Sequence, residues 1–231
     1  MYSDAAPNNE IERIPSKLRD EMFKDITSEL RIHMPGRVYG SELAQGLNEI
    51  LFRQFIKPRG NGLKHNLNPI FVGQYFVDPR NPEITRPLGG ASIDHGQYEG
   101  TGACTELPII RGIIGRAIRT GETVYVPDTT APDLDHISCD SRSVQTPVSE
   151  LVIVSWSQPY TRENPNWTQG LDGKRVPVGV FDLDFQGRDV LDERFRKKLE
   201  RICRLYGSSM FKEMCWNLQP DFRPPNEMAV K

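Results

Sequence analysis

Two kinds of segment predict an α+β fold for this chain, with helices at both ends of the sequence around a central and mostly antiparallel sheet. Apolar residues recur at helical spacing in two segments near the start of the chain and in one long segment near its end. Between them, short runs rich in β-branched and aromatic residues are bounded by proline and glycine turns. Because no internal repeat is evident, we predict one domain over residues 39–216, an N-terminal extension over residues 1–38 and a flexible tail over residues 217–231.

The extension and the start of the domain each carry one predicted amphipathic helix. Residues 16–33 repeat an apolar residue at every fourth position from Leu18 to Leu30, which gives the helix one apolar face. Residues 41–56 carry a second apolar face, and a proline-glycine turn follows each segment. We expect these helices either to pack on one side of the sheet or to pair with those of a second subunit in a homodimer.

The strands of the predicted sheet follow the two helices. They share a high content of β-branched and aromatic residues and are expected at residues 70–77, 105–110, 123–126, 150–156 and 176–185. The fourth of them is nearly continuous in apolar content, which predicts a central strand buried on both faces. The glycine-rich residues 89–102 are expected to form a flexible surface loop.

Two more helices and one long excursion complete the domain. Residues 112–120 and 191–215 carry apolar residues at helical spacing, and Cys203 beside the second stripe is expected to be a small buried apolar residue. Residues 157–174 are rich in proline, glycine and asparagine. This excursion is expected to cover a pocket as a lid or to pack on a partner subunit.

Charge and composition exclude several classes of function. The formal net charge is -2, so the chain has no excess of positive charge that would attract nucleic acid or an anionic membrane. No apolar run approaches the roughly 18 to 20 residues of a transmembrane helix, and the first residues do not form a signal peptide. Four cysteines at irregular spacing are typical of reduced thiols, so a cytoplasmic location is expected.

The loop around Cys139 is the first candidate site. Residues 136–140 read His-Ile-Ser-Cys-Asp, which places a thiol beside an imidazole and a carboxylate in a segment without apolar periodicity. Such surroundings tune the pKa of a thiol and leave it open to attack a substrate. The alternative is a half-exposed thiol without a role. A metal site is not expected, because structural zinc needs four ligands and no second Cys/His pair accompanies His136 and Cys139.

Three carboxylates form the second candidate site. Asp182 and Asp184 stand two residues apart on a predicted strand, so their side chains emerge on one face. Two acids among apolar neighbours are costly unless a cation compensates them, and a substrate ammonium would do so. Their mutual repulsion would keep one of them protonated as an acid. Glu150, at the start of the buried strand, is a further proton donor or ammonium ligand; the alternative for the aspartates is a solvent-facing side of the strand.

Several motifs resemble those of GAF domains. Residues 111–117, 120–122 and 126–128 resemble the G-x-x-G-x-A, G-E and V-x-D signature of that family. Residues 179–184, which read Gly-Val-Phe-Asp-Leu-Asp, and the His-Ile-Ser-Cys-Asp loop are similar to motifs of one subgroup, the free methionine-(R)-sulfoxide reductases. The resemblance spans about residues 40–210 and implies a GAF-like central antiparallel sheet flanked by N- and C-terminal helices.

The resemblance implies thiol-dependent reduction of free methionine-(R)-sulfoxide, or of a related small sulfoxide. A cysteine sulfenic acid and then a disulfide would form, and thioredoxin or another dithiol, rather than a bound cofactor, would restore the thiols. The implied catalytic residues are Cys139, Cys104 and Glu150. The implied substrate-binding residues are Asp182, Asp184, His136, Asp140 and Phe71.

One departure from the subgroup keeps other functions open. Ile114 stands where the family places its middle cysteine, so Cys104 would have to act as the resolving thiol for Cys139. The first alternative is a non-catalytic GAF sensor that binds a small ligand and passes the signal through its terminal helices. The second is a redox switch in which Cys104 and Cys139 form a disulfide without any substrate.

Overall fold

The computed structural model confirms the α+β fold class. It describes residues 16–33, 40–57, 67, 69–78, 80–92, 104–132, 134–137, 149–156 and 177–217. The helices are α1 (Ser16–His33), α2 (Gly40–Ile56), α3 (Gly112–Thr120) and α4 (Glu193–Asn217). The strands are β1 (Pro69–Asp78), β2 (Asn81–Ser92), β3 (Leu107–Pro108), β4 (Val124–Val126), β5 (Ser149–Trp156) and β6 (Pro177–Phe185).

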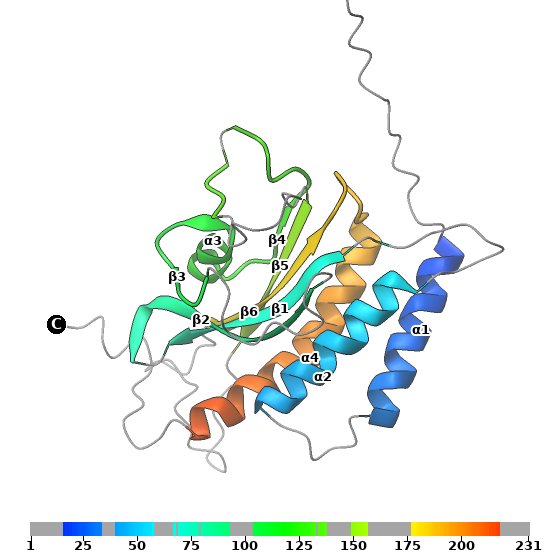
Figure 1. The fold of residues 1–231 in the computed structure, drawn as a ribbon, viewed down its shortest axis with the longest axis horizontal. Helices are drawn as coiled ribbons and strands as arrows, with labels where there is room; N and C mark the ends of the chain where they lie inside the picture. Colours follow the sequence, from blue (N-terminus) through cyan, green and yellow to red (C-terminus); the bar gives the residue numbers. More distant parts are fainter. Residues whose placement is uncertain are drawn as a thin grey trace, which may run out of the picture.

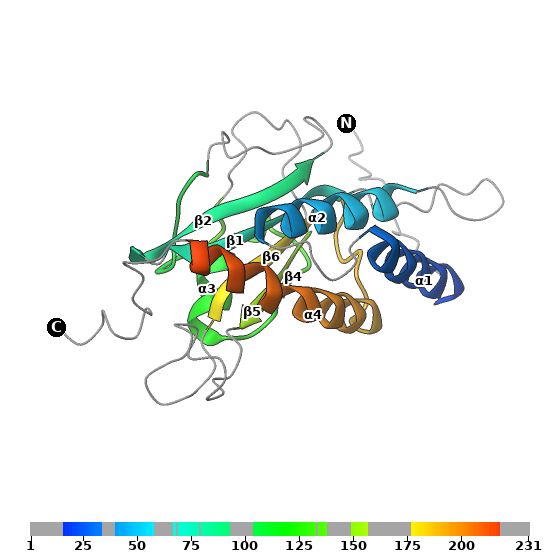
Figure 2. The same cartoon turned by 90° about the horizontal axis from the view of Figure 1, so that it is seen from below.

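The six strands form one sheet with the order β3-β2-β1-β6-β5-β4, and every neighbouring pair is antiparallel. Helices α2 and α4 cover one face, with α1 packed on their outer side, and α3 covers the other face (Figures 1 and 2). The sheet therefore has a helical face and an α3 face, and each carries its own apolar cluster. No helix among the described residues is long and apolar enough to cross a membrane.

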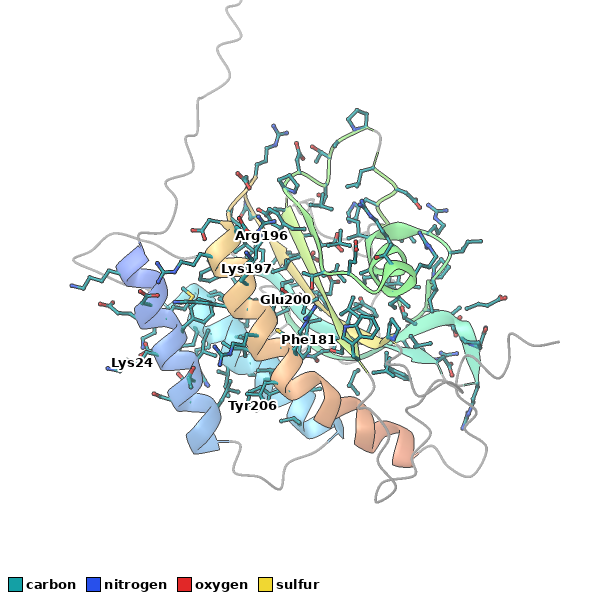
Figure 3. The ribbon with its side chains drawn as sticks, turned by 180° about the vertical axis from the view of Figure 1, so that it is seen from behind. Lys24, Phe181, Arg196, Lys197, Glu200 and Tyr206 are labelled. Carbon is teal, nitrogen blue, oxygen red and sulfur yellow. The ribbon has the colours of Figure 1, made fainter. Side chains whose placement is uncertain are left out.

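The cluster on the helical face joins α1, α2 and α4 to the sheet. Met22 and Ile26 of α1 are fully buried in it, and the rings of Phe23 and Phe195 lie 4.9 Å apart between α1 and α4. Figure 3 shows α4 lying over the sheet, with Phe181 on the strand that it covers. The first two helices thus pack on one side of the sheet, as one of the two sequence-based alternatives predicts.

Polar contacts fix the position of two of these helices. The buried side chains of Asn48 on α2 and Gln74 on β1 pair with each other, and Asn48 Nδ2 donates to Gln74 Oε1 at 2.8 Å. On α4, the guanidinium of Arg196 lies over the Tyr125 ring of β4, 4.3 Å from its centroid. These contacts set the register of α2 and α4 on the helical face.

The cluster on the α3 face is the smaller of the two. Cys104, Ile113 and Ile114 pack there against alternate residues of the sheet, including Val152 and Val180. Helix α3 lies so close to the preceding segment that a Cβ on Gly115 would be 2.4 Å from the Ile109 carbonyl oxygen. Only a glycine at this position permits the approach.

Most of the predicted elements are confirmed, and three differ. Strand β2 was not predicted, and its last residues fall in the predicted glycine-rich loop. Pairing with β1 extends the strand to Ser92, opposite Phe71. Only Leu107–Pro108 of the third predicted segment pairs as a strand. Helix α4 begins at Glu193 because the side chain of Asp192 caps it, accepting a hydrogen bond from the Phe195 N–H at 2.9 Å.

Strand β5 is buried on both faces as predicted, but β1 and β6 are the middle strands and β5 lies next to the edge strand β4. Cys203 is fully buried, and burial raises the pKa of its thiol, as expected of a cysteine that serves as a small apolar residue. Residues 157–174 and the tail from residue 218 lie outside the described residues. The domain limits at residues 38 and 216 stay predictions.

Candidate functional site

The α3 face of the sheet carries a cluster of three carboxylates. Glu150 of β5 pairs directly with Asp184 of β6, and Asp182 stands two residues before Asp184. Because side chains alternate along a strand and Val152 and Val180 belong to the α3-face cluster, all three acids emerge on that face. Their ligand oxygens lie within 4.8 Å of one another. The structure thus confirms that the two aspartates share a face, and it excludes the solvent-facing alternative for Asp182, which is only 6% exposed.

The cluster is compensated internally only in part, by a hydrogen bond between Glu150 and Asp182. Glu150 Oε2, Asp182 Oδ1 and Asp184 Oδ1 are buried and have no hydrogen-bond partner among the described residues. A buried polar atom without a partner costs roughly 1–3 kcal/mol, and more when it is charged. Three such atoms at one point are therefore the signature of a binding site whose ligand supplies the missing donors or charge.

Burial and mutual repulsion keep protons on this cluster. Burial raises the pKa of Glu150 well above its usual value, with a further increase from the charges of Asp182 and Asp184. Burial also raises the pKa of Asp184 well above its usual value, and Asp182 adds to this rise. The pKa of Asp182 is raised by burial to about 7, although its hydrogen bond with Glu150 acts in the opposite direction. Burial therefore favours the protonated forms of Glu150 and Asp184, and Asp182 is near its midpoint at neutral pH.

His136 lies at the edge of the cluster. Its Nε2 atom is 3.6 Å from Glu150 Oε2, which is too long for a hydrogen bond, and its side chain is 15% exposed. Burial lowers the pKa of His136. The lowered pKa of His136 favours the uncharged imidazole and the raised pKa of Glu150 favours the carboxylic acid, so neither shift favours an ion pair between the two groups.

The segment that holds His136 is fixed on the N-terminus of α3. The Gly112 N–H donates to Asp135 Oδ2 at 2.9 Å, which satisfies one of the free N–H groups of the helix start. A Cβ on Gly112 would be 3.0 Å from Ile137 Cδ1, and the φ of Gly112 is +76°, so this position requires glycine. The structure thereby positions the segment that runs into the predicted thiol loop.

Two other predicted site residues belong to the same face. Phe71 of β1 pairs with Asp184 and packs against the α3-face cluster, so its ring lies beside the carboxylates. Cys104 is buried in the α3-face cluster together with Ile114. Cys139 and Asp140 lie outside the described residues, and their place in the site stays a prediction.

Sequence reasoning missed the anchoring role of Asp135 and Gly112. The two residues are separated by 23 positions, and no local pattern links an acid in a loop to the start of an earlier helix. A side chain that accepts from a helix N-terminus normally precedes the helix by one or two residues. Only the folded arrangement could identify this contact.

Comparison with known proteins places the chain beside two kinds of relative. No protein-family model matches it. GAF domain-containing protein A of Dictyostelium discoideum is 30% identical over 143 residues, which are 62% of this chain and 71% of that protein. The free methionine-R-sulfoxide reductase of Saccharomyces cerevisiae is 32% identical over 108 residues, 46% of this chain and 50% of that protein. The chain thus matches only about half the length of that reductase.

Solved structures share the fold at low sequence identity. The free methionine-R-sulfoxide reductase of Neisseria meningitidis in complex with its substrate aligns with a TM-score of 0.57 at 21% identity, covering 88% of this chain and 96% of that one. A putative GAF sensor protein from Burkholderia vietnamiensis aligns with a TM-score of 0.55 at 20% identity, covering 84% of this chain and 97% of that one. These matches show a GAF-like fold, and because a reductase and a sensor match equally well, the fold alone does not separate the two functions.

Proposed function

We propose that this chain, which belongs to the GAF-domain family, is a thiol-dependent reductase of free methionine-(R)-sulfoxide or of a related small sulfoxide. The observation that carries the proposal is the buried cluster of Glu150, Asp182 and Asp184, three acids with unpartnered oxygens on one face of the sheet. The likeness to a yeast protein with this activity supports the same assignment.

The carboxylate cluster suits the ammonium of a free amino acid. An ammonium has three N–H donors, and the cluster offers three unpartnered acceptor oxygens. Binding would replace the repulsion between acids by charge-assisted hydrogen bonds, which are about twice as strong as neutral ones. Phe71 would offer apolar surface to the thioether side chain. A methionine inside a polypeptide lacks the free ammonium, so the proposed substrate is the free amino acid.

The proposed reaction uses one proton and two cysteines. The Cys139 thiolate attacks the sulfoxide sulfur, the oxygen passes to the cysteine as a sulfenic acid with a proton from Glu150, and methionine leaves. The Cys104 thiol then condenses with the sulfenic acid, which releases water and forms a disulfide. Thioredoxin or another dithiol reduces that disulfide by exchange. The reductant is thus the proposed protein partner, in a cytoplasmic setting, and no bound cofactor takes part.

Turnover of free L-methionine-(R)-sulfoxide, measured as methionine released, tests the proposal. Wild type should turn over with thioredoxin or dithiothreitol, and Cys139→Ser should lose activity because the nucleophile is gone. With thioredoxin, Cys104→Ser should stop after one turnover with sulfenic acid on Cys139, whereas dithiothreitol, which reduces a sulfenic acid directly, should restore turnover. Cys203→Ala is the matched control, because this thiol is fully buried on the opposite face of the sheet. Absence of wild-type turnover, or full activity of Cys139→Ser, would contradict the reductase.

The alternative function is a GAF sensor that binds a small amino-acid ligand without turnover. The buried Ile114, in place of the subgroup's middle cysteine, is the observation that favours it. A sensor would bind the sulfoxide with a measurable heat in calorimetry and would leave it unchanged with either reductant. A homodimer, in which the outer helices of two copies pair, belongs to either proposal and is tested by the mass of the protein in solution.

A further inference from the structure

The carboxylate cluster has more ligand oxygens than one ammonium can use. Glu150, Asp182 and Asp184 together carry six carboxylate oxygens, whereas a substrate ammonium has three N–H donors. The three unpartnered oxygens are buried on the α3 face, and the side chain of Glu150 is 5% exposed. Exposed acids are commonly solvated, but buried acids need a cation, a proton or a metal ion.

We propose that Glu150, Asp182 and Asp184 bind one divalent metal cation. A bound cation excludes the ammonium of an amino-acid ligand from the same three carboxylates. The proposal concerns the residues that the proposed function assigns to substrate. Metal binding is nevertheless measured without turnover, so the failure of one proposal leaves the other standing.

The ligand types and their spacing fit a divalent cation. Carboxylate oxygens are the preferred ligands of hard divalent cations such as Mg²⁺ and Mn²⁺. Opposite ligands of one ion at about 2.0–2.4 Å are about 4.0–4.8 Å apart. One oxygen from each of the three acids lies within 4.8 Å of the others, so a single ion can contact all three.

Manganese binding to the metal-stripped full chain tests the proposal, because the electron paramagnetic resonance signal of free Mn²⁺ disappears on binding. Wild type should take up one Mn²⁺ per chain at pH 8 in a saturable way. Asp182→Asn should bind at least tenfold more weakly at pH 8. Glu122→Gln, which removes an exposed carboxylate, is the matched control and should bind as wild type does.

A second readout separates lost binding from lost folding. Because a ligand of the native state raises the melting temperature, Mn²⁺ should stabilise wild type and Glu122→Gln against heat but not Asp182→Asn, whose own transition shows that it is folded. Absence of saturable binding to wild type at pH 8, or equal binding by Asp182→Asn, would overturn the metal site. Displacement of Mn²⁺ by methionine-(R)-sulfoxide tests the ammonium position of the proposed function and not the metal site itself.

Discussion

Replacing Asp182 with asparagine should make the folded protein less sensitive to rising pH. In the unfolded chain this carboxyl releases its proton near its usual pKa of 3.8, whereas burial in the folded protein raises the pKa to about 7. Between these two values the native state holds a proton that the unfolded state has lost. The contribution to stability is complete below the unfolded pKa, and it is lost as the pH rises through the folded pKa.

The size of the effect follows from the pKa difference. A shift from 3.8 to about 7 spans roughly three pKa units, and at about 1.36 kcal/mol per unit it is worth on the order of 4 kcal/mol over the whole window. Between pH 5.5 and pH 7 the wild type should lose about 2 kcal/mol through Asp182 alone. Glu150 and Asp184 add losses of the same sign, because their pKa values are also raised. A typical domain has only about 5–15 kcal/mol of stability in total, so the change is large.

Urea unfolding at pH 5.5 and pH 7 measures this loss as a difference in the free energy of unfolding. Wild type should lose at least about 2 kcal/mol between the two pH values. Asp182→Asn should lose less by about that amount, because asparagine does not titrate. The pH dependence of Glu122→Gln, an exposed carboxylate, should match wild type. Parallel pH curves for wild type and Asp182→Asn would refute the claim that buried protons sit on this cluster.

Two packing predictions concern the contacts of α3 and of α2 with the rest of the domain. Gly115→Ala should destabilise the protein by about 1–3 kcal/mol in urea unfolding, because the new Cβ would lie 2.4 Å from a backbone carbonyl oxygen, and this clash outweighs the roughly 1 kcal/mol gain in helix propensity. An unchanged midpoint would show that α3 can shift at little cost. Asn48→Leu should cost about 1–3 kcal/mol by leaving Gln74 buried without its partner, and the double variant Asn48→Leu/Gln74→Leu should recover part of that loss; equal stability of the single variant and wild type would contradict this.

Local sequence patterns predicted the elements whose signal lies within the element itself. Helices α1 and α3 begin and end at the predicted residues, because their apolar periodicity and the turns after them are local features. Strand β2 was not predicted, because its prolines and glycines favour a loop and it forms a strand only by pairing with β1. Pairing between distant segments overrode the local propensity.

In the candidate site, too, local features were predicted and contacts between distant segments were not. The spacing of Asp182 and Asp184 predicted correctly that both share one face, since alternation is a local rule. The pairing of Glu150 with Asp184, and the contact from Asp135 to the start of α3, depend on the register of the sheet and on the path of a loop. The sequence analysis grouped the three acids as one candidate site, but no composition or spacing in the sequence encodes the contacts that bring them together.

The protonation of this group bears on the choice between reductase and sensor. Binding an ammonium requires an anionic oxygen, whereas protonating a sulfoxide oxygen requires a carboxylic acid. Burial raises the pKa of Asp182 to about 7, so this carboxyl is partly ionised near neutral pH, and the raised pKa of Glu150 favours its protonated form. The proposed reductase uses both forms, an anion that binds the ammonium and an acid that protonates the sulfoxide oxygen, whereas the proposed sensor uses only the anion. A variant that removes the acid at position 150 should therefore abolish turnover by a reductase, whereas ligand binding by a sensor needs only the remaining aspartates.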